Sequence, residues 1–169
     1  FLGSEITSLK DIVLYEKDKG RTQIELYLKQ LLENQNNITN TDIDNLIDKF
    51  LYEFESCSSK HARSDGYQFY YFYNIALHVA IQLNYIAKGK AIYCFLPKNL
   101  MTSELSVEEQ ADFPKLNGTT FLPEANSRKR ALLDFFYSAM LKLVTPNKYK
   151  KLKRFCEWIY KRDFFWNFR

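Results

Sequence analysis

The chain has 169 residues, a length typical of one domain with a substantial buried core. Its 46% hydrophobic residues, 5 Gly and 4 Pro exclude a disordered or collagen-like chain, and its 3 Cys exclude a disulfide-dense miniprotein. The net charge of +4 is a small difference between 24 Lys plus Arg and 20 Asp plus Glu, so the total by itself indicates no activity.

Helical spacing of apolar residues dominates the first half of the chain. It predicts short helices around residues 9–15 and 24–32, then a longer helix from about Asp42 to about Ser56. Thr39 or Thr41 suits the N-cap of the longer helix. The next segment, SCSSKHARSDG, has the composition of a polar turn.

A long apolar helix is predicted from about Tyr67 to Ala87. Lys88 and Gly89 suit its C-terminus, because a cation is favourable there and Gly accepts a left-handed cap. The helix is long enough to cross a bilayer, but five polar residues interrupt it, so we expect a buried helix in the middle of a bundle and no transmembrane segment. Residues 91–97 predict an extended leg.

The second half is irregular at first and then helical. Residues 98–123 are the least regular, with a short capped helix at 106–112 that Pro114 ends. Helices are predicted from Pro123 to about Val144 and from about Asn147 to about Tyr160. The sequence therefore predicts one all-α domain, a bundle of six or seven helices around a central aromatic-rich helix.

Charge is distributed unevenly along the chain. Residues 128–169 carry 12 Lys plus Arg against 3 Asp plus Glu, a charge of +9, and residues 1–127 carry −5. The commoner reason for such an imbalance is pairing between the two halves. The alternative is a patch that binds nucleic acid or an anionic surface, because aromatic residues alternate with the basic ones. Its basic candidates are Lys148, Lys150, Lys151, Lys153, Arg154, Lys161 and Arg162.

A narrow polar stripe runs along the predicted 67–87 helix, where Asn74, His78 and Gln82 recur every four residues. Hydrogen bonding to neighbouring helices and tyrosine hydroxyls explains such a stripe in most proteins. A polar groove that faces a partner is the functional interpretation.

No motif for catalysis, phosphate binding or metal binding is present, so we expect no catalytic residue, cofactor or metal. Cys57 and His61 are four residues apart, the spacing of a nucleophile and base on one helix face, but the turn composition around them disfavours a dyad. Cys57, Cys94 and Cys156 lack the spacing of a zinc site. A Cys57–Cys94 disulfide in an exported protein and three buried thiols in a cytosolic one both stay open.

Several segments together resemble a known family. In order they are Cys57, the helix GYQFYYFYNIALHVAI, the segment GKAIYCFLPKNL with Cys94-Phe-Leu-Pro97, the short helix at 106–112 and the helix ALLDFFYSAML. Over about residues 45–145 this layout resembles periplasmic immunity proteins of type VI secreted amidases. The resemblance implies a Cys57–Cys94 disulfide and a role in binding and blocking a toxin.

The sequence thus predicts a binding protein more readily than an enzyme. A protein partner, reached through the irregular 98–123 segment, is the first hypothesis. Its candidate residues are Asn99, Glu104, Glu108, Glu109 and Asp112. Nucleic-acid or anionic-surface binding through the basic C-terminal helix is the second hypothesis, and a secreted effector or enzyme of unrecognised type is the third.

Overall fold

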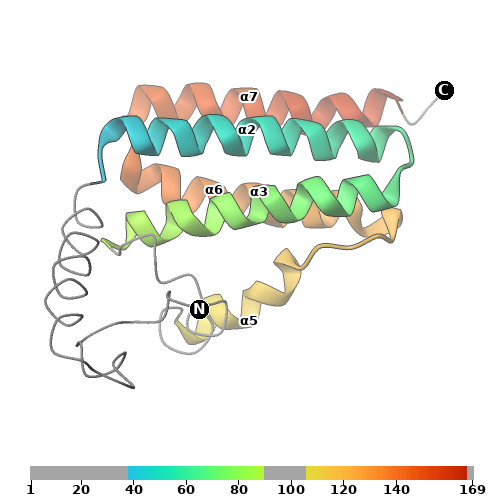
Figure 1. The fold of residues 1–169 in the computed structure, drawn as a ribbon, viewed down its shortest axis with the longest axis horizontal. Coiled ribbons are helices and arrows are strands. Elements are labelled where there is room, and N and C mark those ends of the chain that lie inside the picture. Colours follow the sequence, from blue (N-terminus) through green and yellow to red (C-terminus); the bar gives the residue numbers. More distant parts are fainter. Residues whose placement is uncertain (1–37, 90–105, 167–169) are drawn as a thin grey trace, which may run out of the picture.

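The computed structural model describes residues 38–89 and 106–166 of the chain (Figure 1). Four long helices make up most of this part: α2 (Asn40–Ala62), α3 (Gly66–Ala87), α6 (Ala125–Leu143) and α7 (Pro146–Trp166). A short helix α5 (Val107–Asp112) and two 3₁₀ turns, η3 (Phe113–Leu116) and η4 (Leu122–Glu124), lie between α3 and α6. The described ranges contain no strand, so the predicted all-α class is confirmed for them.

Helix α2 begins where the sequence predicts and ends later. The Thr39 hydroxyl accepts a hydrogen bond from the backbone N–H of Asp42, and the Asp42 carboxylate accepts one from the Thr39 N–H, a complete capping box. The expected turn SCSSKHARSDG is wrong over most of its length, because α2 continues to Ala62. Cys57, Ser58 and His61 are buried there, and tertiary packing outweighs their weak helix propensity.

Helix α3 matches the prediction at both ends. The Asp65 carboxylate caps its N-terminus by accepting from the backbone N–H of Gln68 at 2.9 Å. Gly89, with a φ of 72°, follows its last turn. Gly66 is required by a close approach, because a Cβ atom there would lie 2.5 Å from the Thr120 carbonyl oxygen.

The four long helices form two hairpins that pack together (Figure 1). In one hairpin α2 is antiparallel to α3, and in the other α6 is antiparallel to α7. The hairpins join with α3 beside α6 and α2 beside α7, and both of these pairs are parallel. Salt bridges Lys148–Asp44 and Arg162–Glu55 join the second pair near its two ends.

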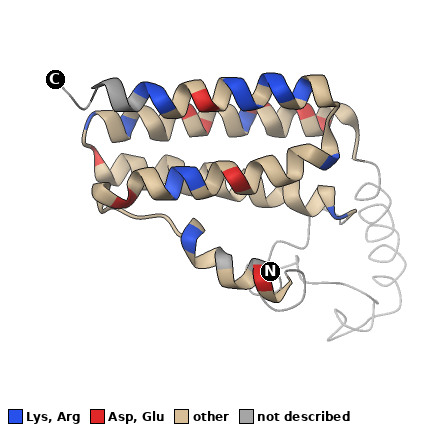
Figure 2. Ribbon diagram, turned by 180° about the vertical axis from the view of Figure 1, so that it is seen from behind, with Lys and Arg blue, Asp and Glu red and all other residues tan. Residues whose placement is uncertain are grey.

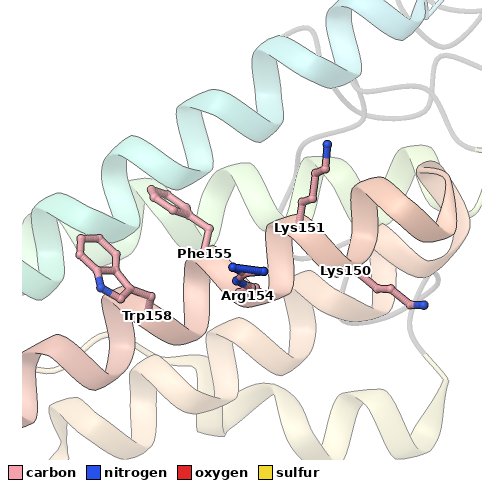
Figure 3. A pocket seen from close by; sticks show the side chains of 5 residues that line it. All are labelled: Lys150, Lys151, Arg154, Phe155 and Trp158. Atoms are coloured by element: carbon pink, nitrogen blue, oxygen red, sulfur yellow. The ribbon is translucent and has the colours of Figure 1, made fainter.

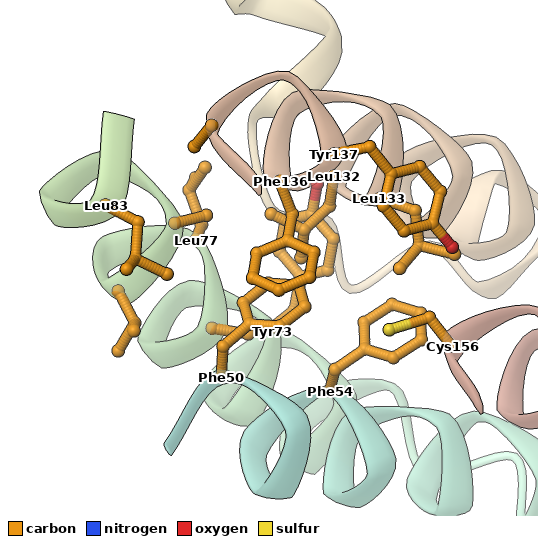
Figure 4. Close-up of a cluster of buried hydrophobic side chains, with 14 of the residues drawn as sticks. Phe50, Phe54, Tyr73, Leu77, Leu83, Leu132, Leu133, Phe136, Tyr137 and Cys156 are labelled. Carbon is orange, nitrogen blue, oxygen red and sulfur yellow. The ribbon is translucent and has the colours of Figure 1, made fainter. Parts of the chain in front are cut away.

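Aromatic rings fill the centre of this bundle (Figure 4). Phe50 of α2 and Phe136 of α6 stack with ring centroids 3.8 Å apart and an interplanar angle of 6°. Tyr73 of α3 is also fully buried, and its hydroxyl donates to the carbonyl oxygens of Leu116 and Arg128, each 3.0 Å away. Lys129 of α6 is fully buried as well. We call Phe50, Tyr73, Lys129 and Phe136 the core seam.

Helices α6 and α7 also follow the predicted pattern. Helix α6 has its apolar side inward as expected, and α7 is longer than predicted, continuing from Tyr160 to Trp166. The predicted helices at 9–15 and 24–32 and the leg at 91–97 lie outside the described residues. Helix α3 contacts α2 and α6, and its Tyr67 and Tyr71 are exposed. None of the helices in the described ranges is sufficiently long and apolar to span a membrane.

Candidate binding surface on helix α7

Helix α7 has one side in the core and another in solvent. Pro146 occupies its first turn, where a missing N–H costs nothing, and the Thr145 carbonyl accepts from the Tyr149 N–H at 2.9 Å. Leu152, Cys156 and Ile159 are buried against the rest of the bundle. The residues between them point outward, so the sequence period of α7 separates a packing side from a solvent side.

The seven basic candidates on α7 fall into two groups. Three of them have intramolecular partners: Lys148 pairs with Asp44, Arg162 pairs with Glu55 at 2.7 Å, and the Lys153 ammonium lies 5.6 Å from the Tyr137 ring centroid. The other four are exposed and form no salt bridge or hydrogen bond within the described ranges. They are Lys150, Lys151, Arg154 and Lys161.

Two aromatic side chains stand beside the second group. Phe155 is 45% exposed and Trp158 is 55% exposed, and their rings stack with centroids 6.0 Å apart. Phe155 has the helical spacing of the buried residues Leu152, Cys156 and Ile159, yet almost half of it is exposed. Among the described side chains of α7, the neighbouring helices fully bury only those three, and Phe155 and Trp158 stay in solvent.

These side chains define one surface, which we call the α7 face: Lys150, Lys151, Arg154, Phe155 and Trp158 (Figure 3). They line an open hollow of about 590 Å³. Lys and Arg recur along the whole of α7 and outnumber its two acidic residues, Glu157 and Asp163 (Figure 2). The α7 face therefore combines a hollow, an aromatic pair and three cations that lack carboxylate partners in the described structure.

The aromatic pair is held in place by a third side chain. The guanidinium of Arg162 lies 5.1 Å from the Trp158 ring centroid and also pairs with Glu55 at 2.7 Å. Phe155 lies one helical turn before Trp158 and Arg162 one turn after it, so the indole has a neighbour on each side along the helix. These contacts restrict the indole before any partner arrives.

The polar stripe on α3 makes contacts mostly within its own helix. The Asn74 amide donates to the Tyr70 carbonyl oxygen at 2.7 Å, and the Gln82 amide lies 3.5 Å from the His78 ring. A Cβ atom at Gly118 would lie 2.6 Å from the Asn74 amide nitrogen, so the chain after η3 packs directly on this stripe. Partial burial lowers the pKa of His78 and favours its neutral form.

Cys57 and His61 lie on one helix face, and both are buried in the core. The Cys57 thiol is fully buried and donates to the Phe54 carbonyl oxygen at 3.2 Å. The His61 Nδ1 atom lies 3.1 Å from the Nζ atom of Lys129, which is itself 0% exposed and lies 5.5 Å from the Tyr160 ring centroid. His61 thus contacts a buried lysine from another helix.

Sequence reasoning missed Lys129, although a signal was available. Lys129 occupies the same helical stripe as Ala125, Leu132, Leu133 and Phe136, all of which are buried. A lysine in register with an apolar stripe is a candidate for burial with a partner. The partner itself, His61 on another helix, could not be inferred from that spacing.

The structure tests the other two cysteines, Cys94 and Cys156, to different extents. No disulfide joins two of the described residues, and Cys94 lies outside them, so the Cys57–Cys94 pairing stays a prediction. Burial raises the pKa of the Cys156 thiol to about 12, which keeps it protonated and unreactive at neutral pH.

The acidic candidates of the 98–123 segment are only partly described. Glu108 lies on α5 and is exposed. Glu109 and Asp112 lie on the same short helix, but their side chains are not described, and Asn99 and Glu104 fall outside the described ranges. The structure therefore brings the basic candidates together on α7 and does not gather the acidic ones into a site.

A second hollow of about 590 Å³ lies between η3 and α6. Its charged lining is already occupied, because Arg130 pairs with both Asp134 and Glu157 at 2.7 Å. In the part of the chain that the structure describes, no group of three or more His, Cys, Asp or Glu side chains could hold a metal ion. The α7 face is thus the stronger candidate site.

Comparison with known proteins adds no relative to this picture. No protein-family model, curated protein or solved structure matches the chain. The functional proposal below is therefore based on the fold and the α7 face.

Proposed function

We propose that this chain is a non-catalytic protein-binding module and that the α7 face is its binding surface. The observation that carries the proposal is the combination on one helix of three cations, which have no carboxylate partner among the described residues, and a half-exposed aromatic pair. Trp and Arg are the residues that most often dominate the energy of protein interfaces. Large exposed rings do not gain the free energy of apolar burial until a partner covers them.

The chemistry of the interior supports the non-catalytic part of the proposal. The thiols of Cys57 and Cys156 are both 0% exposed, and burial keeps Cys156 protonated. Lys129 and His61 contact each other in the core, where a substrate has no access in this conformation. Their burial supports a structural role for these groups.

The resemblance to immunity proteins of type VI secreted amidases gives the proposal a specific form. In that form the partner is a secreted toxin, the protein is periplasmic, and a Cys57–Cys94 disulfide fixes the second half of α2. The 169-residue chain is then a bundle of six or seven helices around α3, and the 98–123 segment, including Glu108, supplies a second contact to the toxin.

Nucleic-acid binding is the competing function. The exposed cations of the α7 face suit phosphates as well as carboxylates. Base stacking needs an open ring surface, and the 55% exposed Trp158 indole, beside Phe155 and Arg162, offers part of one. The hollow beside the two rings favours a protein, because it can accept a protruding side chain.

Affinity capture with matched variants tests the proposal. The face variant Lys150→Glu, Lys151→Glu, Arg154→Glu and the control variant Lys49→Glu, Arg63→Glu, Lys142→Glu change the charge equally, and all six residues are exposed. We expect a protein in nuclease-treated extract from the source cells to be retained by the wild-type and control chains and lost by the face variant. Repetition with that purified partner should give the same ranking of affinities.

Two results would contradict this function. One is equal capture of the same proteins by the face variant and the wild-type chain. The other is turnover of peptidoglycan, nucleotide or peptide substrates that disappears in Cys57→Ala or His61→Ala, which would make the chain an enzyme.

A further inference from the structure

Along α7, cations stand both before and after the two aromatic rings. Lys150, Lys151 and Arg154 come first, the rings of Phe155 and Trp158 follow, and exposed Lys161 comes last. At a rise of about 1.5 Å per residue the whole row spans about 16 Å. A complementary partner must therefore present negative charge, then an apolar group, then negative charge over a similar length.

From this layout we propose that the α7 face recognises an acidic amphipathic segment of a partner protein, in which one large apolar side chain is flanked on both sides by Asp or Glu. This inference rests on the proposed function and specifies its partner. The apolar side chain enters the hollow beside Phe155 and Trp158, and the carboxylates pair with the cations on either side. A segment of about 11 helical residues has the required length.

Charge complementarity is the first argument for this partner. Lys150, Lys151 and Arg154 make no ion pair within the described structure, although α7 lies beside the acidic residues of α2. Lys148 and Arg162 take the nearby carboxylates Asp44 and Glu55 instead. Within the described residues the bundle therefore uses two cations of α7 to hold α2 and leaves Lys150, Lys151 and Arg154 without a carboxylate.

The shape of the surface is the second argument. A hollow of about 590 Å³ receives a protruding side chain, whereas a bilayer surface is broad and offers no single knob to fill it. Between a protein segment and a lipid surface, the geometry thus favours a carboxylate-rich protein segment.

Preorganisation is the third argument. The ladder of Phe155, Trp158 and Arg162 is anchored to α2 through Glu55, so little side-chain entropy remains to be lost on binding. Exposed ion pairs contribute little each, while a buried aromatic anchor contributes more. We therefore expect the aromatic pair to set the affinity and the cations to set the choice of partner.

A random 12-residue peptide library displayed on phage tests the inference directly. Selection uses the full wild-type chain, with removal of phage that also bind the face variant Lys150→Glu, Lys151→Glu, Arg154→Glu. We expect the enriched sequences to carry Asp or Glu on both sides of Leu, Ile, Met or Phe. The affinity of one synthetic peptide of this kind should fall about thirtyfold in Trp158→Ala and stay unchanged in the control Tyr67→Ala, which removes an exposed ring from α3.

The inference is overturned if no peptide is enriched, if the enriched peptides lack either the acidic or the apolar residues, or if a 15-nucleotide oligo-dT or a phosphatidylglycerol vesicle binds the α7 face more tightly than they do. Each of these outcomes leaves the capture experiment unaffected. A native protein partner lost with the face variant would still support the proposed function. Peptide selection as expected, combined with equal capture by the face variant, would instead overturn the proposed function alone.

Discussion

The core seam and the α7 face each contain aromatic rings and cations, but these groups are buried in the core seam and exposed on the α7 face. In the core seam Lys129 is fully buried and contacts His61 and the Tyr160 ring. On the α7 face Lys150 and Lys151 are exposed and make no such contact in the described ranges. The comparison teaches that residue type does not separate groups that hold this fold from groups that remain available to a partner.

The largest expected difference is between two phenylalanines. Phe136→Ala should lower the free energy of unfolding by about 3–5 kcal/mol, because it removes a buried ring stacked on Phe50 at 3.8 Å. Phe155→Ala should change it by about 0.5 kcal/mol or less, because that ring is already half in solvent. Urea unfolding of both variants measures the contrast, and equal losses would remove the distinction between the two regions.

The two kinds of lysine give the next largest effect. Lys129→Ala should cost about 1–3 kcal/mol, because it leaves the buried His61 ring without its Lys129 contact. Lys150→Ala should leave stability nearly unchanged. Lys129→Met serves as a second variant, because it keeps most of the side-chain volume. If Lys129→Met is as stable as the wild type, packing and not the contact with His61 explains the burial of Lys129.

A single buried hydroxyl should have a smaller effect. Tyr73→Phe removes the donor shared by the carbonyl oxygens of Leu116 and Arg128 and should cost about 1 kcal/mol. Tyr71→Phe, at an exposed position on the same helix, is the matched control and should cost nothing measurable. An equal loss in both variants would show that the Tyr73 hydroxyl does not join the η3 segment to the core.

The smallest expected effect is the pH dependence that His78 contributes to stability. His78 belongs to the polar stripe on α3, which is less buried than the core seam and more buried than the α7 face. The pKa of His78 is lowered in the folded chain, so the unfolded chain takes up its proton first as the pH falls. Stability should therefore decrease slightly as the pH falls below the usual histidine value. In His78→Gln this part of the decrease should be absent when unfolding curves are compared between pH 7 and pH 5.5, and an unchanged decrease would contradict the contribution of His78.

Much of the helical layout could be predicted because it depends on local pattern. The apolar period placed α3 and α6, and a cap at Thr39 or Thr41 placed the start of α2. The end of α2 could not be predicted, because Cys57, Ser58 and His61 have weak helix propensity and become helical through burial. Local composition contains no information about which distant helix covers a segment.

The candidate site was predicted in content but not in arrangement. The sequence by itself determined the all-α class of the described ranges, the basic helix α7 and the residues that α7 carries. Tertiary structure alone decided that Asp44 and Glu55 neutralise Lys148 and Arg162, while Lys150, Lys151 and Arg154 make no ion pair within those ranges. It also decided that Phe155 and Trp158 are exposed and that Lys129 is buried. The physical reason is that periodicity fixes which residues share a helix face, whereas only packing against other helices fixes which face is covered.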